Sequence, residues 1–122
     1  MQSYFEVIAM VSTDEVVVLN PTVKIPSRAL EEICQRWKIT ELSCFGSVLR
    51  DDFRIDSDID LLVSFAADAK ITFFNLDTIE QEFSELFGDR PIDIVTRHSI
   101  ENSHNPIRRR NILEHSQVLY NR

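Results

Sequence analysis

Apolar residues along this chain fall into short blocks that alternate with longer periodic stretches. The blocks are bounded by polar turns and contain many β-branched residues, a pattern typical of strands. They predict strands at residues 16–19, 39–45, 58–65, 91–95 and 118–120. The stretches repeat apolar residues every three or four positions, which predicts helices with one buried face over residues 27–38 and 72–87.

The order of these elements indicates an α/β (α+β) fold, in which helices flank a small mixed β-sheet. The elements form two β-α-β-like units, which supports such a sheet. Ser27 is placed to cap the first helix, and the acidic residues of the second, including Glu82, are expected to face water. A further helix is predicted near the end of the chain, where Asn105 caps and Pro106 takes the first position.

The first 26 residues are predicted to form an N-terminal extension, followed by one domain over residues 27–122. Two apolar segments of the extension, residues 7–11 and 16–19, flank a polar turn, which is consistent with a β-hairpin. Residues 21–26 are bounded by prolines and are interpreted as its linker. The sequence assigns the extension no function.

The chain has only two glycines, Gly46 and Gly88, well below the average usage of about 7%. Gly88 follows the second helix, at the position where a left-handed residue is favoured. Gly46 and Ser47 lie between a predicted strand and a short helix that starts at Val48. Glycine allows close approach to the backbone, and the serine hydroxyl and free N–H groups can donate hydrogen bonds. This turn therefore predicts a phosphate site.

Three aspartates lie on or beside predicted strands. Asp58 and Asp60 are two residues apart on one strand, so their carboxylates point to the same face, with α-carbons roughly 6.5–7 Å apart. Two carboxylates this close repel unless one is protonated or a divalent cation joins them. Oxygen ligands favour Mg²⁺ or Mn²⁺. Asp93 interrupts another apolar strand and is either a surface residue or a third carboxylate of this site.

The aspartates before and within the second predicted strand allow other interpretations. Asp56, Asp58 and Asp60 are also compatible with a solvated acidic loop. An EF-hand calcium loop is excluded, because it needs glycine at its sixth position and glutamate at its twelfth, where this chain has Leu61 and Ala67.

Composition narrows the classes of function. The chain has 122 residues, 43% hydrophobic and 27% charged, which suits one globular domain. Its net charge of −7 repels nucleic acid, so direct nucleic-acid binding is not expected, whereas a basic protein partner or bound cations fit. Two cysteines without a CxxC motif, no apolar run long enough to cross a membrane and no basic leader predict a cytoplasmic protein without a zinc site.

Gly46-Ser47, ten further residues and then Asp58-Ile59-Asp60 together resemble the GS-x10-DxD signature of the DNA polymerase β-like nucleotidyltransferase superfamily. The resemblance covers about residues 27–120, and the layout is similar to that of its minimal nucleotidyltransferases, which are usually encoded beside HEPN-domain proteins. It implies the polymerase β-like nucleotidyltransferase fold.

The resemblance also implies roles for individual residues. Asp58 and Asp60 would bind two Mg²⁺ ions, with Mn²⁺ as an alternative, and Asp93 would complete the second site and help activate the attacking hydroxyl. Gly46 and Ser47 would hold the β- and γ-phosphates of ATP. The remaining nucleotide contacts that it implies are Arg50 and Ser57.

The function implied is that of an antitoxin that transfers AMP from ATP to a tyrosine of a partner HEPN RNase toxin, with which it would form a hetero-oligomer. One alternative is a non-catalytic antitoxin that neutralises its partner by complex formation. Another is a small-molecule nucleotidyltransferase, although the chain shows no second helical domain to hold such an acceptor. Arg108, Arg109 and Arg110 are either solvated or provide one contact to a phosphate or partner.

Overall fold

The computed structural model describes residues 16–20, 23–50, 53–54 and 57–122. The elements of the first half are β1 (Val16–Asn20), β2 (Val23–Pro26), α2 (Ser27–Arg36), β3 (Ile39–Phe45), the 3₁₀ helix η1 (Gly46–Leu49) and β4 (Ile59–Phe65). Those of the second half are α3 (Phe73–Leu86), β5 (Ile92–Thr96), α4 (Arg97–Glu101), α5 (Pro106–Glu114) and β6 (Gln117–Asn121).

The main sheet has four strands in the order β5-β4-β3-β6. β3 runs antiparallel to β4 and β6, and β4 runs parallel to β5. The predicted mixed sheet is therefore confirmed. A β-α-β unit forms through α3, between β4 and β5. β2, which precedes α2, pairs with β1 in a separate two-stranded sheet.

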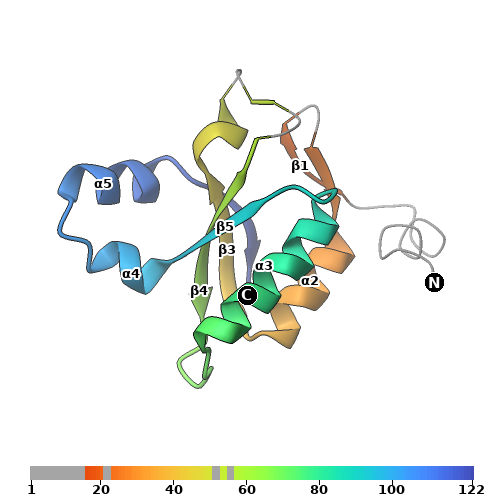
Figure 1. Cartoon of the computed structure of the whole chain (residues 1–122), viewed down its shortest axis with the longest axis horizontal. Coiled ribbons are helices and arrows are strands. Elements are labelled where there is room, and N and C mark those ends of the chain that lie inside the picture. The colour runs from red at the N-terminus through yellow and green to blue at the C-terminus, as the bar shows by residue number, and fades with distance from the viewer. Residues whose placement is uncertain (1–15, 21–22, 51–52, 55–56) are drawn as a thin grey trace.

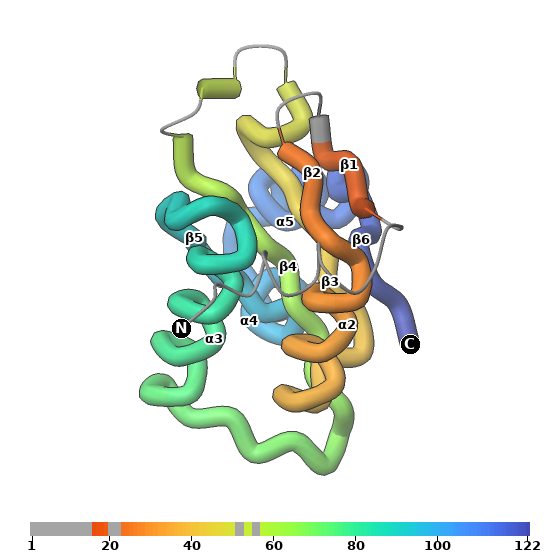
Figure 2. The backbone as a smooth tube through the Cα atoms, turned by 90° about the vertical axis from the view of Figure 1, so that its right-hand side faces the viewer, coloured from red at the N-terminus to blue at the C-terminus, as the bar shows by residue number. Residues whose placement is uncertain are grey.

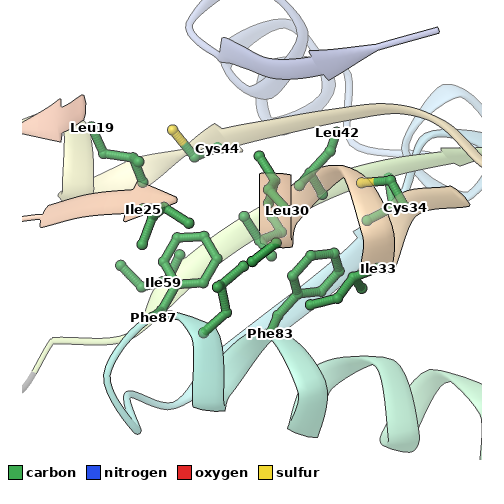
Figure 3. Close-up of a cluster of buried hydrophobic side chains, with 14 of the residues drawn as sticks. Leu19, Ile25, Leu30, Ile33, Cys34, Leu42, Cys44, Ile59, Phe83 and Phe87 are labelled. Carbon is green, nitrogen blue, oxygen red and sulfur yellow. The ribbon is translucent and has the colours of Figure 1, made fainter. Parts of the chain in front are cut away.

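Helices cover both faces of the main sheet, with α2 and α3 on one face and α4 and α5 on the other (Figures 1 and 2). The larger core lies under α2 and α3 and includes Ile33, Phe83 and Ile59 of β4 (Figure 3). A smaller core lies under α4 and α5 and includes Leu62 and Ile112. Because side chains alternate along a strand, Asp60 lies on the same face of β4 as Leu62.

Most helix ends are capped by the residues that the sequence predicts or favours for that role. Thr72 caps α3 in a capping box, accepting from the backbone N–H of Asn75 at 3.1 Å, and Asn75 accepts from the N–H of Thr72 at 2.9 Å. Gly88 has a φ of +84°, as expected of a left-handed residue after a helix. Asn105 caps α5 as predicted. The predicted cap at Ser27 was wrong: Pro26 is the capping residue, and Ser27 is the first residue of α2.

The N-terminal hairpin differs from the predicted one. β1 pairs antiparallel with β2, so residues 23–26 are a strand and not a linker. The other predicted strand, residues 7–11, lies outside the described residues. Leu19, Val23 and Ile25 are buried in the larger core. The described part of the predicted extension thus packs against the domain, and the boundary at residue 26 stays a prediction.

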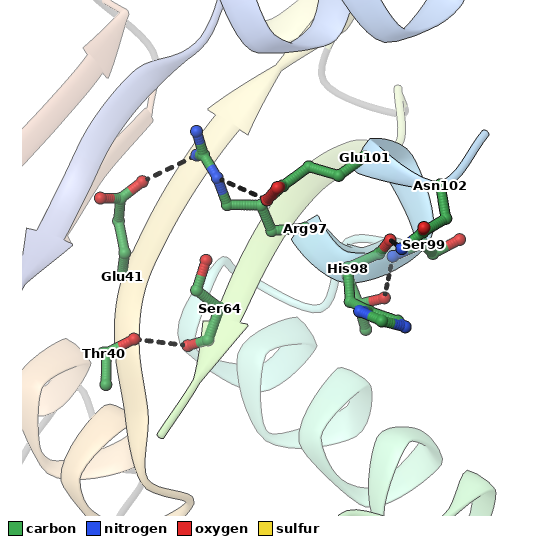
Figure 4. Close-up of polar contacts among 9 residues, drawn as sticks. Thr40, Glu41, Ser64, Arg97, His98, Ser99, Glu101 and Asn102 are labelled. Atoms are coloured by element: carbon green, nitrogen blue, oxygen red, sulfur yellow. Dashed lines mark hydrogen bonds and ion pairs between the residues drawn. The ribbon is translucent and has the colours of Figure 1, made fainter. Parts of the chain in front are cut away.

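α4 was not predicted, because its five residues are too few to show a helical period. Thr96 caps it by accepting from the N–H of Ser99 at 3.1 Å, and Ile100 is buried. Arg97 forms ion pairs of 3.3 Å with Glu41 of β3 and with Glu101, which tie α4 to the sheet (Figure 4). Within the described part of the chain, no helix is long and apolar enough to pass through a membrane.

Candidate active site

Two of the three predicted aspartates face each other across adjacent strands. Asp60 of β4 is in register with Asp93 of β5 in the parallel pair, and with Phe45 of β3 in the antiparallel pair. Asp58 directly precedes β4. All three carboxylates therefore lie at the end of the sheet where β4 begins, with Asp60 half-buried and Asp58 and Asp93 exposed.

The electrostatic environment of Asp60 shows that these carboxylates act on one another. Burial, which disfavours the charged form, makes the largest contribution to raising the pKa of Asp60, followed by the negative charges of Asp93 and Asp58. The guanidinium groups of Arg50 and Arg108 work in the opposite direction and lower that pKa. Asp60 is thus the centre of a cluster of three carboxylates and two cations.

Gly46 links the predicted phosphate turn to this cluster. Its φ is +79°, in the left-handed region that disfavours side chains. A Cβ on Gly46 would also collide with the carboxylate oxygen Oδ2 of Asp60. The backbone conformation favours glycine here, and a Cβ would displace the Asp60 carboxylate, so the turn lies directly against Asp60.

Ser47 and Arg50 are both held by η1. Ser47 is half-buried, and its carbonyl accepts from the N–H of Arg50 at 3.0 Å, which closes the turn. Val48, between them, is fully buried and anchors η1 to the larger core. η1 therefore presents Ser47 and Arg50 on a fixed turn beside Asp60.

Ser57 has a structural contact of its own in the approach to β4. Its Oγ accepts from the N–H of Arg54 at 3.1 Å, and its own N–H donates to the carbonyl of Arg54 at 3.0 Å. These bonds shape the turn just before Asp58. A role for Ser57 in nucleotide binding stays a prediction.

The donor set fits a divalent cation that arrives with a phosphate ligand. Among the described residues, no three His, Cys, Asp or Glu side chains converge closely enough to hold a metal ion by themselves. Mg²⁺, however, is usually bound through one or two carboxylates together with substrate phosphates and water, and not by a complete protein cage. Asp60 with Asp58 or Asp93 meets that need, and a cation there would offset both the burial and the carboxylate repulsion that raise the pKa of Asp60.

Arg108 acts electrostatically on Asp60, and its role is one that the sequence left undecided. It lies on α5, far from Asp60 along the chain, yet its charge lowers the pKa of Asp60. Ile112, one helical turn further on, is buried in the smaller core on the same face of the sheet. The apolar position at i+4 was the only sequence signal that could have indicated which of the three arginines faces the sheet.

A cavity of about 620 Å³ opens beside this cluster, between η1 and α5. Its lining residues are Phe45, Gly46, Leu49, Arg50, Asn111, Ile112, His115 and Ser116. A second cavity of about 470 Å³ lies at the other end of β4, next to Val63, Phe65 and Arg97, and contains none of the predicted site residues. Of these two cavities among the described residues, the first is the one that continues the site.

Comparison with known proteins agrees with this geometry. A family model described as a nucleotidyltransferase domain matches residues 26–119. The chain is 31% identical over 80 residues to "Putative protein adenylyltransferase MJ1217" of Methanocaldococcus jannaschii, covering 66% of this chain and 76% of that protein. It is 30% identical over 84 residues to "Putative protein adenylyltransferase MJ0126" of the same organism, covering 69% of this chain and 80% of that protein.

Solved structures show the same fold. One described as a "putative minimal nucleotidyltransferase" has a TM-score of 0.56 and 30% identity, over 74% of this chain and 85% of its own. Another, titled "Crystal structure of the toxin-antitoxin with AMP-PNP", has a TM-score of 0.60 and 18% identity, over 79% of this chain and 73% of its own. At that identity the second match is evidence for the fold alone.

Proposed function

Because this chain belongs to the nucleotidyltransferase domain family, we propose that it is an Mg²⁺-dependent antitoxin that transfers AMP from ATP to a tyrosine of a partner HEPN RNase toxin. The observation that carries the proposal is the contact between Gly46 and Asp60, with Asp93 in register beside Asp60. It brings the turn predicted to bind phosphate and the carboxylates predicted to bind metal to one point, which supports nucleotidyl transfer.

The chain's own groups position the nucleotide and the acceptor. The N–H groups of η1 and the Ser47 hydroxyl hold the β- and γ-phosphates, and Arg50 and Arg108 add positive charge. Asp58 and Asp60 would hold two Mg²⁺ ions, and Asp93 would complete the second site. Bound Mg²⁺ would supply positive charge that stabilises the negative charge of an in-line displacement.

The reaction forms one bond and breaks one. The acceptor oxygen bonds to the α-phosphorus, and the bond from that phosphorus to the bridging oxygen breaks, so that pyrophosphate leaves. Asp93 accepts the hydroxyl proton of the acceptor. Positioning and electrostatics dominate phosphoryl transfer, so few catalytic side chains are needed.

A protein acceptor is supported by the relatives, which are named as protein adenylyltransferases. Three of the solved structures of this fold are titled as toxin–antitoxin structures, two of them naming MntA together with HepT or HpeT. The net charge of −7 suits a toxin whose RNA-binding surface is basic. The buried free thiols of Cys34 and Cys44 are compatible with the cytoplasm.

The proposal is tested by intact-mass spectrometry of a candidate HEPN partner after incubation with this chain, ATP and Mg²⁺. We expect the partner to gain AMP on a tyrosine, and the variant with Asp58→Asn and Asp60→Asn to add none. Asp77→Asn, an exposed aspartate on α3, is the matched control and should leave transfer unchanged. A partner that gains no AMP from the wild-type chain would overturn the proposal.

The negative charge also favours a second candidate, an antitoxin that neutralises its partner by covering it. The two candidates differ in the double aspartate variant, since a purely covering antitoxin needs no carboxylates at the metal site. If that variant still protects cells from the toxin as well as the wild-type chain does, the second candidate is supported. Loss of protection supports catalysis, provided that the variant still binds the toxin.

A further inference from the structure

We propose that the cavity between η1 and α5 binds the nucleoside of the donor nucleotide, and that Asn111 of α5 selects adenine in it. This inference rests on the proposed function and extends it to residues outside the signature motif. The volume of the cavity, about 620 Å³, falls within the range of roughly 300–1,000 Å³ that is usual for small-molecule sites.

The cavity is continuous with the candidate active site. Gly46 lines it and also abuts the carboxylate of Asp60. Phe45, another lining residue, is paired with Asp60 across β3 and β4, so both side chains lie on the face of the sheet that α5 covers. A ligand in this cavity can therefore extend its phosphates over Gly46 to the three aspartates.

The positions of residues along α5 indicate which end of the nucleotide would lie near Asp60. Arg108, Asn111 and Ile112 of α5 occupy positions i, i+3 and i+4, which place them on one side of the helix, and His115 is the residue that caps its C-terminal end. Arg108 is the member of this row whose charge reaches Asp60, whereas Asn111 and His115 line the cavity. The row thus runs from the phosphates at Arg108 to the nucleoside at Asn111 and His115.

The acceptor is expected to approach from a different side. In an in-line displacement the attacking oxygen enters opposite the leaving pyrophosphate, which is held at η1. Across the sheet, Asp93 lies on the far side of Asp60 from η1, because β4 separates β5 from β3. The acceptor therefore reaches Asp93 without passing through the cavity, which leaves the cavity to the nucleoside.

The lining suits a purine and favours adenine. Phe45, Leu49 and Ile112 provide apolar surface for a base. The Asn111 amide has one acceptor oxygen and one NH₂ donor group. These groups complement the N6 amino group and the N7 acceptor on one edge of adenine. Guanine presents two adjacent acceptors, O6 and N7, on the corresponding edge, and one amide cannot satisfy both with its donor and acceptor groups.

Titration calorimetry with Mg²⁺ and three probes tests the inference: ATP, GTP and inorganic tripolyphosphate. We expect the wild-type chain to bind ATP more tightly than GTP or tripolyphosphate. Asn111→Leu should weaken ATP binding by about tenfold, the equivalent of one lost pair of base hydrogen bonds, with little change for tripolyphosphate. Asn121→Leu, an exposed asparagine on β6, is the matched control and should bind all three probes as the wild-type chain does.

A second variant tests the cavity independently of Asn111. Leu49→Trp fills the cavity from η1, so it should weaken ATP and GTP together and preserve tripolyphosphate binding, which also shows that the variant is folded. Equal losses for ATP and tripolyphosphate in both variants, or unchanged ATP binding in both, would overturn the inference and leave the proposed function standing. A wild-type chain that binds neither ATP nor tripolyphosphate would overturn the proposed function as well.

Discussion

The carboxylate of Asp60 occupies the space in which a side chain on Gly46 would have to lie. The two residues are fourteen positions apart, and antiparallel pairing of β3 with β4 brings them together. Gly88 has nearly the same backbone conformation, with φ of +84° against +79°, but no atom lies within 4 Å of its Cβ position. Substitutions at the two glycines can therefore be compared to separate the effect of backbone strain from the effect of contact with Asp60.

Removing the charge of Asp60 should change how stability depends on pH. Its pKa is raised in the folded chain, so the folded state binds that proton more tightly than the unfolded state does. The stabilisation from this proton is fully present below the ordinary pKa of 3.8 and is lost as the pH rises through the folded value.

In the absence of divalent cations, the melting temperature of Asp60→Asn relative to the wild-type chain should therefore rise between about pH 3 and pH 7. Thermal unfolding across this range, followed by circular dichroism, measures the difference. Added Mg²⁺ should stabilise the wild-type chain more than the variant. A difference in melting temperature that is independent of pH would contradict the account of this cluster.

Arg108 should contribute to nucleotide binding through its position near Asp60. Arg108→Ala is expected to raise the KM for ATP by about tenfold, which is within the free energy of one hydrogen bond to a charged group. Arg108→Lys should restore part of the affinity. Arg110→Ala is the control, because Arg110 is highly exposed and pairs with Glu114 on α5. Equal effects of the two alanine variants in steady-state kinetics would argue against a specific role for Arg108.

Glu82 should stabilise the packing of α2 against α3. Its carboxylate accepts from Arg36 and from the indole N–H of Trp37, so the prediction that it faces water was wrong. Glu82→Gln should lower the free energy of unfolding by about 1–2 kcal/mol, since the interaction with Arg36 is partly screened by solvent. Urea unfolding measures this effect, and Glu85→Gln, an exposed neighbour on α3, should change it little. An equal change in both variants would contradict it.

The sequence indicated which residues of the candidate site lie close together better than it indicated the packing around them. Gly46 and Ser47 follow β3, and Asp58 and Asp60 lie at the start of β4, so the pairing of these two neighbouring strands brings them together. The roles of these residues stay predictions. For Asp93 the sequence left two possibilities, a surface residue or a third carboxylate of the site. Its register with Asp60 depends on the crossover through α3.

The features that were missed depend on contacts between distant segments. α4 is too short to show a period, and its anchor is the ion pair of Arg97 with Glu41, 56 residues away. The prolines around residues 21–26 suggested a linker, but residues 23–26 form β2 because they pair with β1. Arg108 could be distinguished from its neighbours only after the packing of Ile112 fixed which side of α5 faces the sheet.

The comparison of Gly46→Ala with Gly88→Ala in transfer of labelled AMP from ATP to the partner protein tests most directly whether the turn and the carboxylates form one active site. Both variants carry similar backbone strain and should lose similar stability, of order 1–3 kcal/mol. At a temperature at which both are folded, we expect Gly46→Ala to transfer AMP about 100-fold more slowly, as a displaced Asp60 would dictate, and Gly88→Ala to match the wild-type chain. Equal rates for the two variants would contradict the account.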